Sequence, residues 1–272
     1  MNKRTLSSVV LAIVIISILV LNIPLLDTIF IFVLSVMGIY EYNKAFKNAG
    51  YHPIEWVEYI ASLTIFFMGG YIDIQTKIVL ARILIPILLI LMFIYIFLKD
   101  LKVSVIDLAI TLLSVVYIPF MFSFLKLILS MNMGRLLVMY AFFGAFSSDI
   151  FAYLIGCKFG KRKLCPTISP KKTVEGSIAG IIGVVITYII ITFIGNNYCG
   201  ANLNYIYISI LAVVAGITGQ FGDLAASAIK RHCNIKDFGN ILPGHGGILD
   251  RYDSVMFVAP VVYIFLKVYM GM

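Results

Sequence analysis

The sequence has few charged residues: Asp, Glu, Lys and Arg make up 12% of its 272 residues, whereas hydrophobic residues make up 61%. Soluble domains carry about 25% charged residues, so this composition excludes an ordinary water-soluble protein. The mean hydropathy of +1.03 is typical of a chain that is embedded in lipid. We expect membrane lipid as a partner and no nucleic acid.

Cysteine is also scarce. The chain has four cysteines, and no two of them form a Cys-x-x-Cys pair. This spacing favours neither a disulfide framework nor a zinc site, and packed or exposed thiols are the simpler interpretation. Internal repeats and low-complexity tracts are absent as well, so nothing in the sequence indicates a repeat architecture.

Long apolar runs, in contrast, are abundant. The first run, Leu6–Ile23, follows Lys3 and Arg4 and lacks a small-residue cleavage site, so we expect a retained span and not a signal peptide. A membrane helix needs about 20 mostly apolar residues. By this criterion we predict an all-α integral membrane protein, a polytopic bundle of about nine transmembrane helices. The predicted spans are 5–23, 25–42, 55–72, 78–98, 104–125, 134–157, 176–195, 205–229 and 252–270.

The basic residues predict an orientation. Cytoplasmic connections carry an excess of Lys and Arg. With nine spans and a cytoplasmic N-terminus, 16 of the 21 basic residues lie inside, and the C-terminus lies outside. Two inner loops, 158–175 and 230–251, differ from the short tethers elsewhere. The positive-inside rule explains the sign of their charge, but it does not explain the glycines, serines and acids between the basic residues.

Three polar residues share one face of the eighth predicted span. Asp223, Ser227 and Lys230 are spaced i, i+4 and i+7, so a helix places them in one stripe. Asp223 lies about 10 Å of helix rise before Lys230 and therefore inside the apolar layer. An ionisable group there usually faces a cavity or a partner. The alternative is an Asp–Lys pair that serves packing alone. Gly216 and Gly219 near the same stripe allow a neighbouring helix or a ligand to come close.

Three further acids fall near the same depth. Asp149 precedes Lys158 by nine residues, and Asp250 and Asp253 share a face at the start of the ninth span. Bracing inside the bundle is the alternative for Asp149. Capping of the helix N-terminus is the alternative for Asp253. For Asp250, which is followed by Arg251 and preceded by His-Gly-Gly, we favour a functional role.

Together these residues predict a site for metal and polyphosphate beside lipid. Mg²⁺ binds through one or two carboxylates together with substrate phosphates. The glycines of Pro-Gly-His-Gly-Gly allow backbone amides to approach phosphate oxygens. Basic side chains neutralise phosphate charge. The glycines and basic residues that we assign to nucleotide binding are Gly246, Gly247, Lys171, Lys172, Arg231 and Arg251.

One segment resembles a known family. The stretch SAIKRHCNIKDFGNILPGHGGILDRYDS resembles the signature of the CDP-diacylglycerol synthases, also called phosphatidate cytidylyltransferases, and SDIFAYLIGCKFGKRKLCPTISPKKTVEG is similar to theirs too. The likeness covers 147–254. Tyr252 departs from it, since an aliphatic residue is usual there. The short stretch before the first apolar run resembles bacterial members.

The resemblance implies an activity and a site. Members join CTP and phosphatidic acid into CDP-diacylglycerol and pyrophosphate, require a divalent metal and form dimers. It implies that Asp223 and Asp250 are the metal-centre carboxylates, and that Ser227, Lys230 and His245 lie in the same site. We therefore expect Mg²⁺, with a second cation, monovalent or divalent, left open. Asp149 and Asp253 are further metal candidates.

These expectations define a domain plan and a location. We expect one polytopic domain over 1–272, in which 1–133 supplies N-terminal spans and 134–272 supplies the catalytic spans and cytoplasmic loops. The protein is expected in the cell (plasma or inner) membrane, with its active site toward the cytoplasm and as a homodimer. Two alternatives stay open. One is a CTP-dependent lipid kinase of the polyprenol or phytol type, and the other is an ion-coupled transporter.

Overall fold

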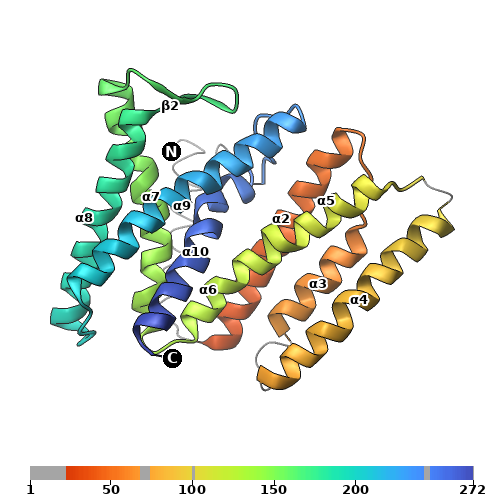
Figure 1. Cartoon of the computed structure of the whole chain (residues 1–272), viewed down its shortest axis with the longest axis horizontal. Coiled ribbons are helices and arrows are strands. Elements are labelled where there is room, and N and C mark those ends of the chain that lie inside the picture. Colours follow the sequence, from red (N-terminus) through yellow and green to blue (C-terminus); the bar gives the residue numbers. More distant parts are fainter. Residues whose placement is uncertain (1–22, 68–73, 100–101, 242–245, 272) are drawn as a thin grey trace.

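The computed structural model describes residues 23–67, 74–99, 102–241 and 246–271. These residues form long helices and one small hairpin (Figure 1). The helices are α2 Pro24–Asn48, α3 Glu55–Phe67, α4 Ile74–Leu98, α5 Val105–Val115, α6 Met121–Leu129, α7 Gly134–Phe159, α8 Val174–Tyr198, α9 Tyr205–His232 and α10 Leu249–Tyr269. A π-helical turn, η2 Val116–Phe120, joins α5 to α6, and the strands are β1 Lys163–Cys165 and β2 Ser169–Thr173.

Local sequence signals explain several helix starts. Ser104 and Asp107 form a capping box at α5, in which the Ser104 hydroxyl accepts from the Asp107 amide and the Asp107 carboxylate accepts from the Ser104 amide. Thr173 caps α8 and Asn204 caps α9 in the same manner, each accepting from a backbone amide of the first turn. Polar residues at the ends of apolar runs therefore fix where these helices begin.

The fifth predicted span contains the π-helical turn. Pro119 lies within η2 and has no amide hydrogen to donate, which favours a local change in hydrogen bonding. The segment Val105–Leu129 nevertheless remains one continuous helical segment that is long and apolar enough to cross a membrane.

The prediction of a helical polytopic membrane protein is confirmed. Among the described residues, six helical segments are long and apolar enough to cross a membrane. They are Pro24–Asn48, Val105–Leu129, Gly134–Phe159, Val174–Tyr198, Tyr205–His232 and Leu249–Tyr269. Residues 5–22 of the predicted span 5–23 lie outside the described residues, as does the end of the predicted span 55–72, in which α3 covers only Glu55–Phe67.

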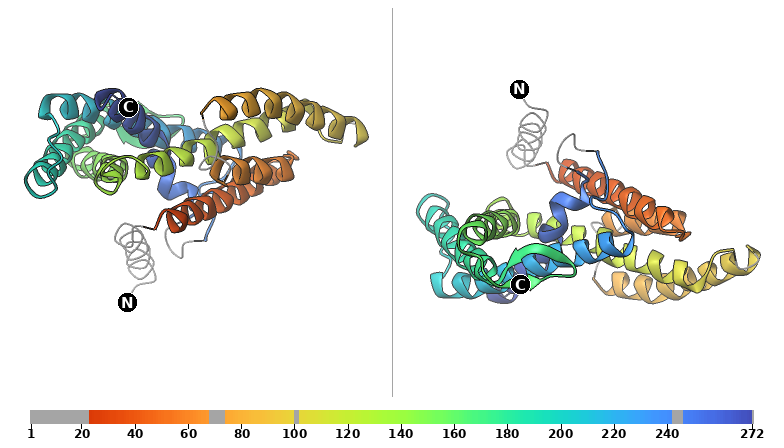
Figure 2. Two further views of the ribbon diagram at one scale, coloured as in Figure 1. Left: turned by 90° about the horizontal axis from the view of Figure 1, so that it is seen from below. Right: turned by 90° about the horizontal axis from the view of Figure 1, so that it is seen from above.

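Two buried clusters hold the helices together. The larger one contains side chains of α2 and of α6 to α10, among them Tyr42, Tyr140 and Tyr252. The smaller one joins α3, α4 and α5 through residues that include Val57 and Met92. In the ribbon views α4 lies at the edge of the molecule farthest from α8 (Figures 1 and 2). Residues 134–272, which we expected to supply the catalytic spans, are thus packed against α2 of the N-terminal half.

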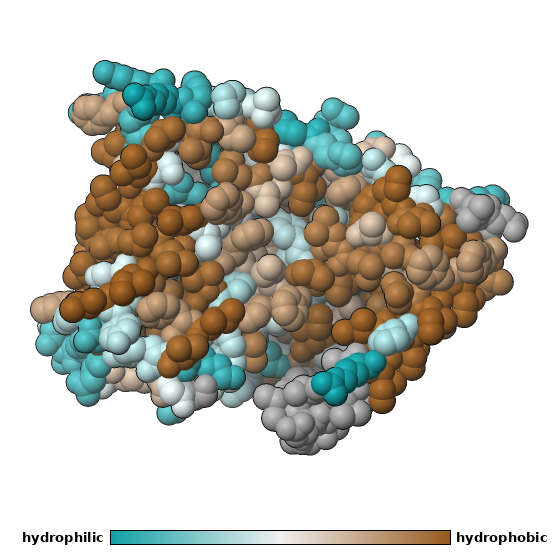
Figure 3. Space-filling view, viewed as in Figure 1, coloured by the Kyte–Doolittle hydropathy of each residue, from teal (hydrophilic) through white to brown (hydrophobic). Residues whose placement is uncertain are grey.

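The surface of the molecule is divided into apolar and hydrophilic regions. A broad apolar band covers the middle of the molecule, and hydrophilic residues gather at its upper edge over the hairpin and the end of α9 (Figure 3). Long apolar side chains such as Ile182, Phe193 and Ile210 remain exposed on the membrane-length helices α8 and α9. A bilayer around the band removes their contact with water, and the upper edge then lies at the boundary between lipid and water.

Candidate active site

The candidate residues gather at one end of the bundle, where α9 ends and α10 begins. The antiparallel β1–β2 hairpin, which the sequence did not predict, lies at the same end (Figure 1). Arg231 ties the hairpin to α9, because its guanidinium donates to the backbone oxygen of Ile168 at 3.3 Å and to that of Ile235 at 3.2 Å. The structure therefore uses Arg231, which we expected to bind nucleotide, to hold the hairpin in place.

The first charged pair joins the hairpin to α9. The ammonium group of Lys172 on β2 forms a salt bridge with the carboxylate of Asp223 on α9, and both side chains are about one quarter exposed. Successive residues of a strand point to opposite faces, so Lys171 does not share this contact, and it is exposed. The two adjacent lysines, which we expected to act together, thus occupy different environments.

The second charged pair joins α9 to α10. The ammonium group of Lys230 lies 2.7 Å from Oδ1 of Asp250, with side chains 11% and 5% exposed. Oδ2 of Asp250 accepts from the amides of Phe238 at 2.9 Å and Gly247 at 3.0 Å. The Asp250 carboxylate is therefore fixed on one side by backbone amides and on the other by an ammonium group.

The sequence placed Asp223 and Lys230 on one helix face, and the alternative for Asp223 was a pairing with a lysine for packing alone. In the structure Asp223 pairs with Lys172 and Lys230 pairs with Asp250, so each has its partner on a different element. Ser227 lies between them on α9 and is partly buried. Arg251 is exposed on α10 next to Asp250.

Two further carboxylates lie beside Asp223. Asp149 on α7 and Asp253 on α10 both interact electrostatically with Asp223 and with each other. Asp253 is 6% exposed, and its carboxylate accepts the amide of the next residue, Ser254, at 2.7 Å. Because α10 begins at Leu249, Asp253 lies beyond the first turn and does not cap the helix, so the capping alternative for this residue is wrong.

The glycines before α10 determine the backbone conformation of the loop that leads into this helix. Gly246 has a φ of +84°, a conformation that side-chain-bearing residues rarely adopt, and the amide of Gly247 donates to Asp250. We expected the backbone amides of this loop to face phosphate oxygens. In the structure the amide of Gly247 faces the carboxylate of Asp250 instead. His245, the remaining candidate, lies outside the described residues.

The carboxylates suit a cation that also binds substrate. No group of three or more His, Cys, Asp and Glu side chains that could hold a metal occurs within the described residues. Mg²⁺ does not require such a cage, because it takes one or two protein carboxylates and completes its shell with water and phosphate oxygens. Asp223 is partly exposed and Asp250 is held in place by hydrogen bonds, so the donor chemistry of these carboxylates fits a magnesium ion.

The sequence reasoning missed Glu41 of α2. Its carboxylate is 1% exposed and accepts from the amides of Ile248 and Leu249, each at 3.0 Å. It thereby caps α10 from a helix more than 200 residues away in the chain. The available signal was an acid inside a predicted apolar span, the same signal that identified Asp223.

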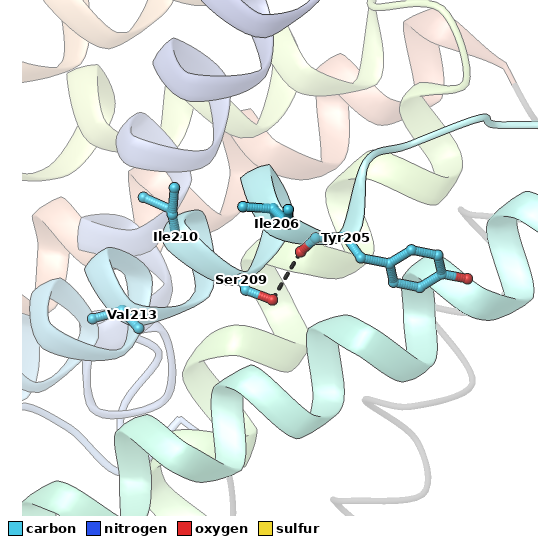
Figure 4. Close-up of a pocket in the computed structure, with 5 residues that line it drawn as sticks. All are labelled: Tyr205, Ile206, Ser209, Ile210 and Val213. Carbon is cyan, nitrogen blue, oxygen red and sulfur yellow. Dashed lines mark hydrogen bonds between the residues drawn. The ribbon is translucent and has the colours of Figure 1, made fainter.

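A groove on α9 lies away from these residues. Tyr205, Ile206, Ser209, Ile210 and Val213 line it near the other end of the helix (Figure 4). The Ser209 hydroxyl donates to the backbone oxygen of Tyr205 at 2.8 Å, which leaves a mostly apolar wall. Such a wall suits lipid or another apolar surface, and it offers no charge to a nucleotide.

Comparisons with known proteins point to one family. The sequence model of the cytidylyltransferase family matches residues 2–269. A phosphatidate cytidylyltransferase of Staphylococcus haemolyticus (strain JCSC1435) is 42% identical over 165 residues, which cover 61% of each chain. That of Bacillus subtilis (strain 168) is 41% identical over 158 residues, 58% of this chain and 57% of the relative. These alignments thus span less than two thirds of the relatives' own lengths.

Proposed function

The chain belongs to the cytidylyltransferase family, and from this premise we propose that it transfers CMP from CTP to phosphatidic acid, giving CDP-diacylglycerol and pyrophosphate. The observation that carries the proposal is the position of two carboxylate–ammonium pairs, Lys172–Asp223 and Lys230–Asp250, at one end of an apolar bundle. The names of the similar proteins agree with this activity.

The reaction is a displacement at phosphorus. A phosphatidate oxygen attacks the α-phosphorus of CTP, a new P–O bond forms, and the bond to the pyrophosphate oxygen breaks. The attacking oxygen is already anionic at neutral pH, so a strong general base is not required. The main obstacle is the repulsion between two anions, and catalysis then depends on positioning and charge neutralisation.

The basic residues supply that neutralisation. We propose that Lys172 and Lys230 contact the substrate phosphates. The ammonium group of each already lies at the site, where it is paired with a carboxylate. Arg251 and Lys171 are exposed nearby and add positive potential, while Arg231 keeps the hairpin against α9. Ser227, Gly246 and Gly247 lie within the same region, and we place His245 with them.

We propose Mg²⁺ as the cofactor, held by Asp223 and Asp250, with Asp149 and Asp253 as further candidates and a second cation left open. When bound there, the ion would supply positive charge to the phosphates and to the pyrophosphate leaving group. The four acids offer only oxygen ligands, which supports this choice of metal. Three of them, Asp149, Asp223 and Asp253, also repel one another, and a bound cation would relieve that repulsion.

We also propose the finer topology. One domain over 1–272 would have nine spans, an inner N-terminus and an outer C-terminus. It would lie in the cell membrane as a homodimer with its active site toward the cytoplasm. The positive-inside bias of the sequence supports this orientation. Phosphatidate would then enter from the inner leaflet with its acyl chains still in lipid.

Product analysis tests the proposal. The purified protein is incubated with phosphatidate, Mg²⁺ and CTP labelled at the α-phosphate in one sample and at the γ-phosphate in another. We expect the α-label in lipid and the γ-label in pyrophosphate. Transfer of the γ-label to lipid, with release of CDP, would indicate a lipid kinase. Uptake of an ion without CTP turnover would indicate a transporter.

A further inference from the structure

We propose that Glu41 of α2 is a positioning residue for the active site, which holds Asp250 and the Gly246–Gly247 turn in register with Lys230. This inference rests on the proposed function, because it assigns Glu41 a part in nucleotide and Mg²⁺ binding. It concerns a residue in the N-terminal half, outside the segment of the sequence that carries the family signature.

The Glu41 carboxylate has no basic side chain within salt-bridge distance among the described residues, although it is almost fully buried. Burying a lone carboxylate is costly unless hydrogen bonds replace its water. Here the amides of Ile248 and Leu249 do so, each 3.0 Å from a different carboxylate oxygen. The positive end of the α10 dipole adds further stabilisation.

The surrounding turn is built around this carboxylate. A Cβ atom added to Gly247 would lie 2.5 Å from Oε2 of Glu41, and one added to Gly239 would lie 2.5 Å from Oε1. Both positions therefore accept only glycine while Glu41 stays in place. Gly247 is also the residue whose amide donates to Asp250, so Glu41 and Asp250 both contact the same turn.

The consequence is a chain of contacts from α2 to the metal candidates. Glu41 fixes the amides at the start of α10, the turn fixes Oδ2 of Asp250, and Oδ1 is left facing Lys230. A catalytic carboxylate must be held within about 0.5 Å of its productive position. Loss of the Glu41 contacts is expected to loosen Asp250 without removing any group that touches substrate.

Glu41→Gln tests this role. The amide side chain keeps the volume but can accept through one atom only, so one backbone amide loses its acceptor. We expect hydrogen–deuterium exchange of peptides over residues 246–252 to become about 10-fold faster, measured without Mg²⁺ or nucleotide. We also expect the Mg²⁺ concentration for half-maximal CMP transfer to rise about 10-fold, with the KM for phosphatidate within about 2-fold of wild type.

Asp27→Asn is the matched control. Asp27 lies on the same helix, is 5% exposed and forms a bidentate pair with Arg135, at 2.8 and 2.6 Å, remote from the site. It should lower thermal stability and leave both the exchange of 246–252 and the Mg²⁺ dependence unchanged. If Glu41→Gln cannot be purified, Gly247→Ala displaces the same contact from the turn and should give the same two changes.

The outcomes separate this inference from the proposed function. Wild-type exchange and wild-type Mg²⁺ dependence in Glu41→Gln would overturn it, and so would equal changes in Asp27→Asn. If the wild-type protein does not transfer CMP, the proposed function fails by itself. The exchange measurement then still decides whether Glu41 holds the turn.

Discussion

At the scale of the residue, the site consists of carboxylates and ammonium groups that neutralise one another. Asp223 is paired with Lys172, and Asp250 with Lys230 and two backbone amides. Removing one member of the more buried pair, Lys230–Asp250, leaves an uncompensated charge, which costs more than the pair itself contributes. In the proposed function the same lysines contact the substrate phosphates, so each substitution is expected to lower activity.

Lys172→Ala should lower kcat/KM for CTP by at least about 10-fold, because a charge-assisted contact is worth about 1.5–3 kcal/mol. Steady-state kinetics with varied CTP measure the effect. Lys171→Ala is the matched control, since its side chain is the exposed neighbour on the other face of the strand. It should stay within about 3-fold of wild type. Equal losses in the two variants would mean that the Asp223 pairing has no functional role.

At the scale of the element, the close contact of α9 with α10 sets the distances within the site. A Cβ atom added to Gly222 would lie 2.5 Å from the backbone oxygen of Asp253. Gly222 precedes Asp223, so any separation of the helices at this point moves Asp223 away from α10. Glycine at this position thus brings the acids of two helices together.

Gly222→Ala should therefore destabilise the protein by about 1–3 kcal/mol, the usual cost of forcing an extra carbon atom into a packed contact. Gly219→Ala is the milder comparison, because its Cβ atom would lie 3.1 Å from a side-chain carbon of Val258, a less severe contact than the 2.5 Å approach to backbone at Gly222. Thermal unfolding in detergent, followed by circular dichroism, measures both. A Gly222→Ala protein that unfolds at the wild-type temperature would contradict the close approach of the two helices.

The sequence predicted the helices better than their partners. Apolar runs and helical spacing are local signals, and they predicted α7 to α10 and the face of α9 that carries small residues. Gly219 does meet α10, and Gly216 meets Ile181 on α8, as the spacing suggested. The partners of Asp223, Lys230 and Glu41 lie on other elements, and a choice among several nearby opposite charges is made by tertiary packing, which local periodicity does not encode.

At the scale of the whole molecule, the hairpin and the connection from α9 to α10 lie at one end, and the connection from α8 to α9 lies at the other (Figure 1). The first end carries most of the basic residues of 134–272. The proposed orientation places that end in the cytoplasm, where CTP would be available to it.

Native cysteines test this orientation. Cys157 near the end of α7 and Cys199 after α8 are both exposed, at opposite ends of the bundle. In single-cysteine variants, a membrane-impermeant maleimide should label Cys199 in intact cells and Cys157 only after permeabilisation. Cys233 is an internal control, since burial raises the pKa of its thiol and slows its reaction. The reverse labelling pattern would contradict the proposed topology.

The most direct test of the central claim is CMP transfer by the purified Asp223→Asn protein in the presence of Mg²⁺. If Asp223 holds the metal beside the phosphates of CTP, kcat/KM should fall by at least about 100-fold, because a metal contact of this kind is worth several kcal/mol in the transition state. The unfolding temperature should stay close to that of wild type, since the Asp223 side chain is about one quarter exposed. Near wild-type turnover in this variant would contradict the account.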